Sequence, residues 1–355
     1  MGKNKKIGCF TLLLLYTPLI MAMQPLDDQS LSVATGQNGL NIGVQLSKID
    51  FNQIAVIDTD GFAKKGETAL TQAALVMAAS PNAATPSLGI DFVQTFNANG
   101  TIQTSTSQLL QAAIDTDKGA SGSGGAFVNL ALTFGSNVNG IRIRPFSVYL
   151  VPHDPIGIDA LSSLTGSNYV RKSIFTTGTI LKPNIKELLR IGNIDVEFVS
   201  NNKPTMNLQL GGAPQGHMLM FGGAIKSVCG ATSLNPDGCS INLVSGNTGA
   251  KFDLQMTAND SDPTDTTPGF SLNGFYAGIE GKTGTNIGET GGVVFGNVGK
   301  SEKFDASINN VWLGDTIPVG SLNSNTFNGL QNGSMGSWGI KGASITDLKV
   351  KISGL

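Results

Sequence analysis

The chain has 355 residues, 46 of them glycine, and only 14% of its residues are charged. With 40% apolar residues it is not a disordered chain, and its many glycine, asparagine, serine and threonine residues are typical of β-rich extracellular proteins. The formal net charge is −2, and the only dense basic cluster lies within the first six residues, so the composition excludes a nucleic-acid partner.

Residues 1–22 have the layout of a Sec signal peptide. Three lysines precede the apolar run Cys9–Met21, and the small residue Ala22 follows it. The run is shorter than the roughly 20 apolar residues that a transmembrane helix needs. We therefore expect an exported protein of residues 23–355, at the cell surface, in a fimbrium or in the periplasm, without a transmembrane segment. Its 20 basic and 25 acidic residues give a net charge near −5.

The stretch "LDDQSLSVATGQNGLNI" follows almost directly after the signal. Asp27 or Asp28 can cap one short helical turn, and Gly36 can end it. Asn38-Gly39 then predicts a turn into a strand over Leu40–Leu46. We interpret this stretch as a folded N-terminal plug or assembly handle rather than a cleavable leader.

Alternation of apolar and polar residues predicts strands along the whole chain, each with one buried and one wet face. The segments are 39–46, 126–134, 139–146, 193–199, 205–210, 251–256 and 347–352. In the third of them Ile141 and Ile143 face one side and the two arginines the other. In the last of them we expect Leu348, Val350 and Ile352 to point inward and Lys349 and Lys351 outward.

Helical patterns are few. The Ala-rich segment Glu67–Ser80 is the best candidate, and residues 104–115 and 185–191 are short ones. The predicted fold class is all-β, an antiparallel sandwich or an elongated sheet or solenoid, with a few short helical insertions. The Gly/Ser-rich stretch 115–126 and the polar run 257–269 are each either a seam between domains or a long surface loop.

Cys229 and Cys239 are the two cysteines outside the signal, and they flank the turn sequence Asn235-Pro236-Asp237-Gly238. Two cysteines around a turn in an exported chain predict a disulfide that closes a hairpin. A metal pair would need further ligands, and none is close in the sequence.

Catalytic constellations are absent from the sequence. The two histidines, His153 and His217, show no metal-binding spacing, and no G-x-S-x-G elbow occurs. We expect no catalytic residues and no cofactor, with one calcium candidate. Its carboxylates lie at the short intervals of calcium loops, against a plain solvated turn as the alternative: Asp260, Asp262 and Asp265.

The segment "MQPLDDQSLSVATGQNGLNI", Met23–Ile42, resembles the mature start of the FilA-type pilus-system proteins of Gram-negative bacteria, with the pattern M-Q-x-L-D-D-x-x-L-x-x-x-T-G-Q-x-G-[LI]. Softer similarities are Ile191–Met220 and the terminal "SWGIKGASITDLKVKISGL". The resemblance implies association with a surface fibre. It implies no catalytic residues.

The sequence thus favours a non-catalytic structural or assembly component of a bacterial surface fibre. It would bind other fibre or surface proteins by adding a strand to an open sheet edge. The candidate assembly residues are Leu40, Ile42, Val44, Leu46, Leu348, Val350 and Ile352. The alternative is an adhesin or carbohydrate-binding module with exposed aromatic residues, from the set Trp312, Trp338, Tyr149, Tyr169 and Tyr276; an exported hydrolase is a third and weaker hypothesis.

Overall fold

The computed structural model describes residues 39–58, 73–81, 87–117, 125–152, 173–211, 217–232, 235–245, 248–259, 269–282, 291–315 and 334–353. The chain divides into two compact units, Met1–Leu40 and Asn41–Leu355, and nearly all described residues belong to the second. Every regular element in these ranges is a β-strand, and the strands form an eight-stranded, a fifteen-stranded and a two-stranded sheet. The prediction of an all-β, antiparallel fold is confirmed.

The strands are arranged in eight consecutive runs, each of which crosses from one large sheet to the other; we call each run a pass. The odd-numbered passes leave the eight-stranded sheet: β1 (Leu40–Gln45), β2 (Lys48–Phe51) and β3 (Gln53–Asp58) in pass 1; β8 (Phe127–Phe134), β9 (Gly140–Ile143) and β10 (Phe146–Pro152) in pass 3; β16 (Leu219–Gly222), β17 (Ala224–Val228) and β18 (Cys239–Ser245) in pass 5; β22 (Gly292–Asn297) and β23 (Phe304–Asp315) in pass 7.

The even-numbered passes return: β4 (Ala73–Ala79), β5 (Leu88–Phe96), β6 (Ile102–Thr104) and β7 (Gln108–Asp117) in pass 2; β13 (Lys186–Ile191), β14 (Ile194–Phe198) and β15 (Thr205–Gly211) in pass 4; β19 (Thr248–Ala258), β20 (Phe270–Ser271) and β21 (Phe275–Glu280) in pass 6; β24 (Trp338–Ala343) and β25 (Lys349–Ile352) in pass 8. The short hairpin of β11 (Phe175–Thr177) and β12 (Ile180–Leu181) precedes pass 4.

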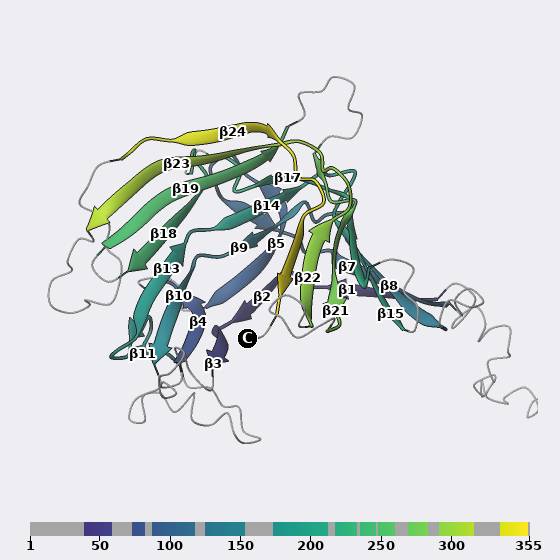
Figure 1. Ribbon diagram of the computed structural model, residues 1–355, viewed down its shortest axis with the longest axis horizontal. Coiled ribbons are helices and arrows are strands. Elements are labelled where there is room, and N and C mark those ends of the chain that lie inside the picture. Colours follow the sequence, from purple (N-terminus) through teal and green to yellow (C-terminus); the bar gives the residue numbers. More distant parts are fainter. Residues whose placement is uncertain are drawn as a thin grey trace, which may run out of the picture. The chain divides into compact units, whose positions relative to one another are not determined.

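The order of the strands in each large sheet follows the order of the passes, so each pass pairs with the one before it and the one after it. Figure 1 shows this sequence in the fifteen-stranded sheet, where β24, β23, β19, β18, β13, β10 and β4 lie next to one another from yellow to purple. Passes 1 and 8 are therefore the two edges: β1 and β25 end the eight-stranded sheet, while β2 and β3 on one side and β24 on the other end the fifteen-stranded sheet.

Two apolar clusters stabilise the passes. One joins the two large sheets, with Phe92 and Phe198 from the fifteen-stranded sheet and Leu109 and Phe275 from the eight-stranded sheet. The other lies on the part of the fifteen-stranded sheet that β4 and β10 form, around the fully buried Tyr149. Burial of apolar side chains from both large sheets in the first cluster holds the two parts of the interior passes at fixed positions.

The crossing of pass 5 depends on a glycine. Gly223, between β16 and β17, has a φ of 75°, a left-handed conformation that favours glycine. A Cβ at this position would lie 2.0 Å from the carbonyl oxygen of Lys203 in the neighbouring pass. The chain can therefore change sheets here only because residue 223 has no side chain.

The helix predicted over Glu67–Ser80 is wrong in its described part, since residues 73–79 form β4. The helix propensity of alanine is overridden here by packing. Ala74, Val76 and Ala78 are almost completely buried in the cluster around Tyr149, where Ile174 and Leu181 also pack. Small side chains fit this closely covered strand, so the alanines have a packing role.

The two short helices predicted over 104–115 and 185–191 are also wrong, because these residues contribute to β7 and β13. In β13, Glu187 and Arg190 form an ion pair of 2.8 Å at the i, i+3 spacing of a helix. The strand achieves this spacing through a bulge: Val148 pairs with Leu189 and Tyr149 with Glu187, which leaves Leu188 as an extra residue. The bulge brings both charged side chains to one face.

The two predicted seams can be placed only in part. Residues 118–124 lie outside the described residues, but β7 and β8 on either side of them pair with each other over eight residues, from Leu110↔Phe134 to Asp117↔Phe127. In the polar run, Thr257 and Ala258 belong to β19, and residues 260–268 lie outside the described part.

Candidate functional site

The first predicted assembly strand is the edge strand β1. Leu40, Ile42 and Val44 are 51%, 39% and 38% exposed, and their spacing of two places them on one side of the strand. Leu46 follows the strand and packs against the cluster between the two large sheets. The alternating pattern thus predicted the strand correctly, but the expected buried face is wrong for β1, since all six of its residues are exposed.

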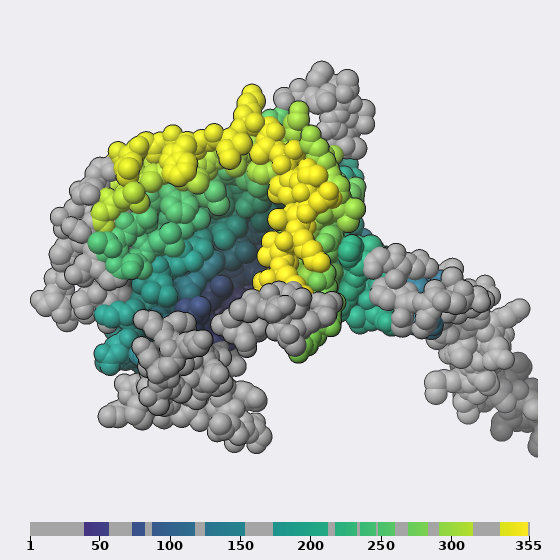
Figure 2. Space-filling model, in the orientation of Figure 1, coloured from purple at the N-terminus to yellow at the C-terminus, as the bar shows by residue number. Residues whose placement is uncertain are grey.

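The second predicted assembly strand is the opposite edge, β25. It pairs on one side with β22, through Phe295↔Val350 and Val293↔Ile352. The expectation that Val350 and Ile352 point into a core is wrong, because they are 44% and 70% exposed. Their partners on the interior strand β22, Phe295 and Val293, are 42% and 54% exposed, so this face of the eight-stranded sheet is exposed at β22 as well as at the edge. Figure 2 shows the last pass, in yellow, as a continuous strip of the surface.

The lysines of β25 fasten this edge to the sheet. The expected outward position is wrong for Lys351, whose side chain is only 17% exposed, against 52% for Lys349. Both lysines form ion pairs with Glu280, which lies two strands away on β21. The hydrogen bond from Lys349 holds the pKa of Glu280 below its ordinary value of 4.5 and raises the pKa of Lys349 above 10.5. At its start the strand is fixed by Asn297, whose side-chain oxygen accepts a hydrogen bond of 2.8 Å from the backbone N–H of Leu348.

The opening stretch that carries the family resemblance lies outside the described residues up to Asn38. Gly39 has a φ of 76°, and β1 begins at the next residue. Left-handed backbone at this point is what a turn into the strand requires.

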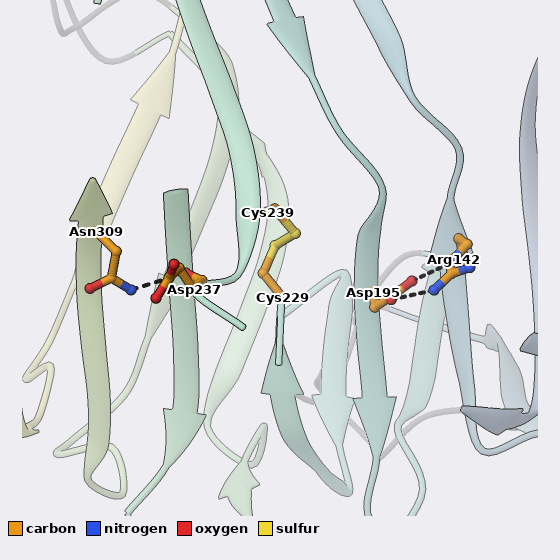
Figure 3. Close-up of a disulfide and its surroundings, with 6 residues drawn as sticks. All are labelled: Arg142, Asp195, Cys229, Asp237, Cys239 and Asn309. Carbon is orange, nitrogen blue, oxygen red and sulfur yellow. Dashed lines mark hydrogen bonds and ion pairs between the residues drawn. A yellow bond between two sulfur atoms is a disulfide. The ribbon is translucent and has the colours of Figure 1, made fainter. Parts of the chain in front are cut away.

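Cys229 and Cys239 form a disulfide with a Cα–Cα distance of 5.2 Å, which confirms the predicted pairing (Figure 3). The predicted hairpin is wrong. β17 and β18, which the two cysteines follow and begin, both pair antiparallel with β19, so they run in the same direction along one strand. The disulfide therefore closes an excursion, residues 230–238, within a single pass and keeps the pass continuous.

The excursion is held in place by hydrogen bonds from β23 of pass 7. Asp237 accepts hydrogen bonds from Asn309 through its carbonyl oxygen, at 2.9 Å, and from Asn310 through its carboxylate, at 2.8 Å. Figure 3 shows the side chain of Asn309 directed at Asp237. Asn310 also donates to Asp253 of β19 at 3.0 Å, so one amide links three passes.

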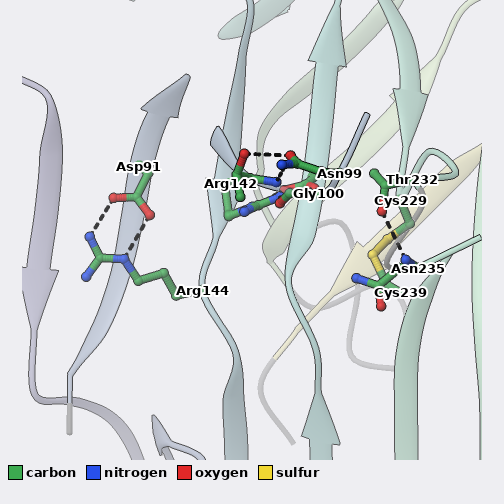
Figure 4. Close-up of polar contacts among 11 residues, drawn as sticks. Asp91, Asn99, Gly100, Arg142, Arg144, Cys229, Thr232, Asn235 and Cys239 are labelled. Carbon is green, nitrogen blue, oxygen red and sulfur yellow. Dashed lines mark hydrogen bonds and ion pairs between the residues drawn. A yellow bond between two sulfur atoms is a disulfide. The ribbon is translucent and has the colours of Figure 1, made fainter. Parts of the chain in front are cut away.

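A row of ion pairs lies beside the disulfide on the polar face of the fifteen-stranded sheet. Arg142 binds both carboxylate oxygens of Asp195 at 2.6 Å, and its third contact is the carbonyl oxygen of Gly100 at 3.1 Å (Figures 3 and 4). Both charged side chains are mostly buried, with 11% and 15% exposure. The prediction that Arg142 faces away from Ile141 and Ile143 is confirmed, since it pairs in register with Asp195.

Arg144 extends this row toward the edge. It binds both oxygens of Asp91, as Figure 4 shows, and reaches Asp50 of β2 at 2.6 Å. Hydrogen bonds from Lys48 and then Arg144 lower the pKa of Asp50, and the bond to Asp91 raises the pKa of Arg144. These contacts connect passes 1, 2 and 3. Sequence reasoning missed the acidic partners, although Asp91 and Asp195 each stand between two apolar strand residues and so mark a polar face.

The aromatic residues proposed for stacking on a sugar are mostly unavailable. Tyr149 is completely buried, and Tyr276 is 9% exposed and stacks on His217 at 3.5 Å between ring centroids. Trp312 is partly buried in β23, and Tyr169 lies outside the described residues. Trp338, at the start of β24, is 65% exposed.

A shallow groove of about 370 Å³ lies at the edge of the fifteen-stranded sheet that β24 forms, across β19, β23 and β24. Its lining includes Asp305, Lys341 and Gly339. Asp305 accepts hydrogen bonds from the backbone of Gly342, at 2.7 Å, and from Asn259, at 2.6 Å, which lower its pKa. The groove is thus pre-formed, and one of its two charged lining residues, Asp305, is already engaged in holding β24.

The three predicted calcium ligands, Asp260, Asp262 and Asp265, lie outside the described residues, as does His153. In the part of the chain that the structure describes, no group of three or more histidine, cysteine, aspartate or glutamate side chains could hold a metal ion. None of the described segments forms an apolar helix of membrane-spanning length. A comparison with known protein families, curated proteins and solved structures finds no match to this chain.

Proposed function

We propose that the protein is an exported, non-catalytic structural or assembly component of a surface fibre, and that its edge strands supply the contacts. The observation that carries this proposal is the exposure of apolar side chains along both edges of an antiparallel sheet. A strand edge offers a row of backbone donors and acceptors, and apolar side chains on it favour pairing with another chain.

Two further features support the proposal. The disulfide suits the oxidising conditions of an exported protein. Natural sheets usually blunt their edges with lysine, proline or very short strands. In β1 all six residues are exposed, the apolar Leu40, Ile42 and Val44 among them, and the strand contains no charged residue at all.

The direct test is deletion of the gene, followed by imaging of the cell surface and analysis of sheared surface fibres. The proposal predicts altered or missing fibres in the deletion strain, restoration by the wild-type gene, and the protein itself in the sheared fraction. Unchanged fibres together with absence of the protein from that fraction would refute it.

A second candidate function, an adhesin or carbohydrate-binding module, is favoured by Trp338. Its exposed side chain directly precedes Gly339, which lines the groove on the same strand together with Asp305 and Lys341. Indole rings stack on sugar faces, and polar groups beside them fix the orientation of the sugar. Binding of the purified protein to a glycan array that Trp338→Ala abolishes would support this role, and absence of binding to any glycan would count against it.

A further inference from the structure

The exposed apolar residues of the protein are concentrated on its two edges. Of the 21 large apolar residues that are exposed among the described ones, ten belong to passes 1 and 8, although these are only two of the eight passes. Pass 1 contributes Leu40, Ile42, Val44, Ile49, Ile54 and Val56, and pass 8 contributes Trp338, Ile340, Val350 and Ile352.

In the fifteen-stranded sheet the apolar residues of both edges lie on the same face. Residues that pair across antiparallel strands share a face. Val56 pairs with Leu75, and Leu75 with Leu150. The same face continues through β13, β18, β19 and β23, where Ile308 pairs with Trp338. A strand added to either edge with its apolar residues on this side would therefore extend one continuous apolar surface.

The directions of the two edges are complementary. Pass 1 runs from the eight-stranded to the fifteen-stranded sheet, and pass 8 runs back. Placed side by side, pass 8 of one copy and pass 1 of another are antiparallel, with β25 next to β1 and β24 next to β2 and β3. Two copies of the same edge would be antiparallel only if the eight-stranded sheet of one copy met the fifteen-stranded sheet of the other.

We infer that the protein binds a second copy of itself, with pass 8 of one copy adding to pass 1 of the next. The inference rests on the proposed fibre role and names the partner in it. The interface joins two different surfaces, so a linear assembly keeps one open edge at each end and can add further copies there, unless the rotation from copy to copy closes it into a ring. Each junction continues both large sheets in the antiparallel sense that all eight passes already use.

Blocking the two edges separately tests the inference. Lysines that point from an edge strand oppose edge pairing unless the sheet itself engages them, as Glu280 engages Lys349 and Lys351. The pass 1 block is Ile42→Lys with Ile54→Lys, and the pass 8 block is Ile340→Lys with Val350→Lys. The matched control is Leu243→Lys with Ile279→Lys, which changes two exposed apolar residues, 44% and 70% exposed, on the interior passes 5 and 6. The size of the purified proteins is measured by sedimentation velocity over a range of concentrations.

The wild type and the control are expected to form a concentration-dependent series of oligomers, and each blocked variant is expected to be monomeric. A 1:1 mixture of the two blocked variants is expected to form dimers and nothing larger, because each supplies the edge that the other lacks. A dimer formed by one blocked variant alone, a mixture that stays monomeric, or a monomeric wild type would each overturn the inference.

Cross-linking supplies a readout that does not depend on the blocks. Ile42→Cys and Val350→Cys are made as separate proteins and oxidised together, and a mixed disulfide dimer is expected. A third protein carries both cysteines in one chain. If it forms a disulfide within that chain and the separate variants form no mixed dimer, the inference is overturned, because the two edges of a single copy would then pair with each other.

The two proposals fail in different ways. Monomeric purified protein that is nevertheless present in sheared fibres would leave the fibre role intact with another neighbour. Self-assembly of a protein that is absent from the fibres would leave the pairing intact and refute the fibre role.

Discussion

Cys229 and Cys239 are bonded at the point where β17 ends and β18 begins along the same strand, β19, so their disulfide closes an excursion of nine residues in the middle of one pass. The bond keeps the two halves of pass 5 in line with their neighbours. It also lies between the ion pair of Arg142 and the Asp237 contacts, which hold the adjoining passes.

Removing this disulfide should weaken the whole sheet. For a loop of this length, Cys229→Ala with Cys239→Ala is expected to lower the free energy of unfolding by about 2–3 kcal/mol, because the unfolded chain gains freedom. Urea denaturation at neutral pH measures the change. Identical midpoints for the double variant and the oxidised wild type would show that the excursion needs no closure.

Gly238, next to the disulfide, should not tolerate a side chain. Its φ is 107°, and a Cβ would lie 2.1 Å from the carbonyl oxygen of Leu254. Gly238→Ala is expected to cost about 2–4 kcal/mol, from the left-handed conformation and the clash with β19 together. The control is Gly299→Ala, at a φ of 76° with no atom near its Cβ, which is expected to cost only about 1 kcal/mol. Equal losses from both variants in thermal unfolding would contradict the close approach.

The Arg142–Asp195 pair should be strongly coupled. Removal of one partner leaves a mostly buried charge unpaired, so Arg142→Gln or Asp195→Asn alone is expected to cost about 2–4 kcal/mol. The double variant should recover about 1–3 kcal/mol relative to the sum of the two. The exposed pair Lys226–Glu197 is the control, with an expected coupling below about 1 kcal/mol. Additive losses at Arg142 and Asp195 would mean that the pair contributes nothing beyond its two side chains.

The attachment of β25 should depend on pH at both ends of the scale. The pKa of Glu280 is lowered, so its stabilising effect is complete above about pH 5 and is lost as the pH falls below 4.5. The pKa of Lys349 is raised, so its effect is present below pH 10.5 and is lost as the pH rises further. Methyl NMR signals of Val350 and Ile352 should therefore be constant between these limits and shift outside them.

Glu280→Gln is the control for the acidic limb. The variant keeps the shape of the side chain but has no charge to lose, so its β25 signals should not change between pH 6 and pH 3. An acidic transition that persists unchanged in the variant would assign it to another carboxylate.

Many of the strands were predictable, because alternation of apolar and polar residues identifies a strand wherever one of its faces is exposed to solvent. Val128 to Phe134 and Ile194 to Phe198 alternate in this way, and both are strands. The alternation also indicated that Arg142 faces away from Ile141. The pairing of the two cysteines was predicted from their number and from the export that the first residues of the sequence indicate.

Other features depend on contacts that are distant in the sequence. The strand at Ala73–Ala79 forms because Ile174 and Leu181 cover it, and the helix-like spacing of Glu187 and Arg190 results from a bulge against β10. The disulfide resembles a hairpin closure in the sequence, since only β19 shows that β17 and β18 are collinear. Alternation also cannot tell whether the apolar face of a strand is covered, and Ile352 lies on a face that is exposed on the neighbouring strand β22 as well.

The most direct test of the edge-strand account is amide hydrogen exchange at Leu40–Gln45 and Lys349–Ile352, in the protein within sheared surface fibres and in the same protein after dissociation to monomers. If these strands are the contacts, their amides should exchange much more slowly in the fibre, because added strands occupy their free side, while amides of the central strand β15 should exchange equally in both states. Equal exchange of both edge strands in fibre and monomer would contradict the account.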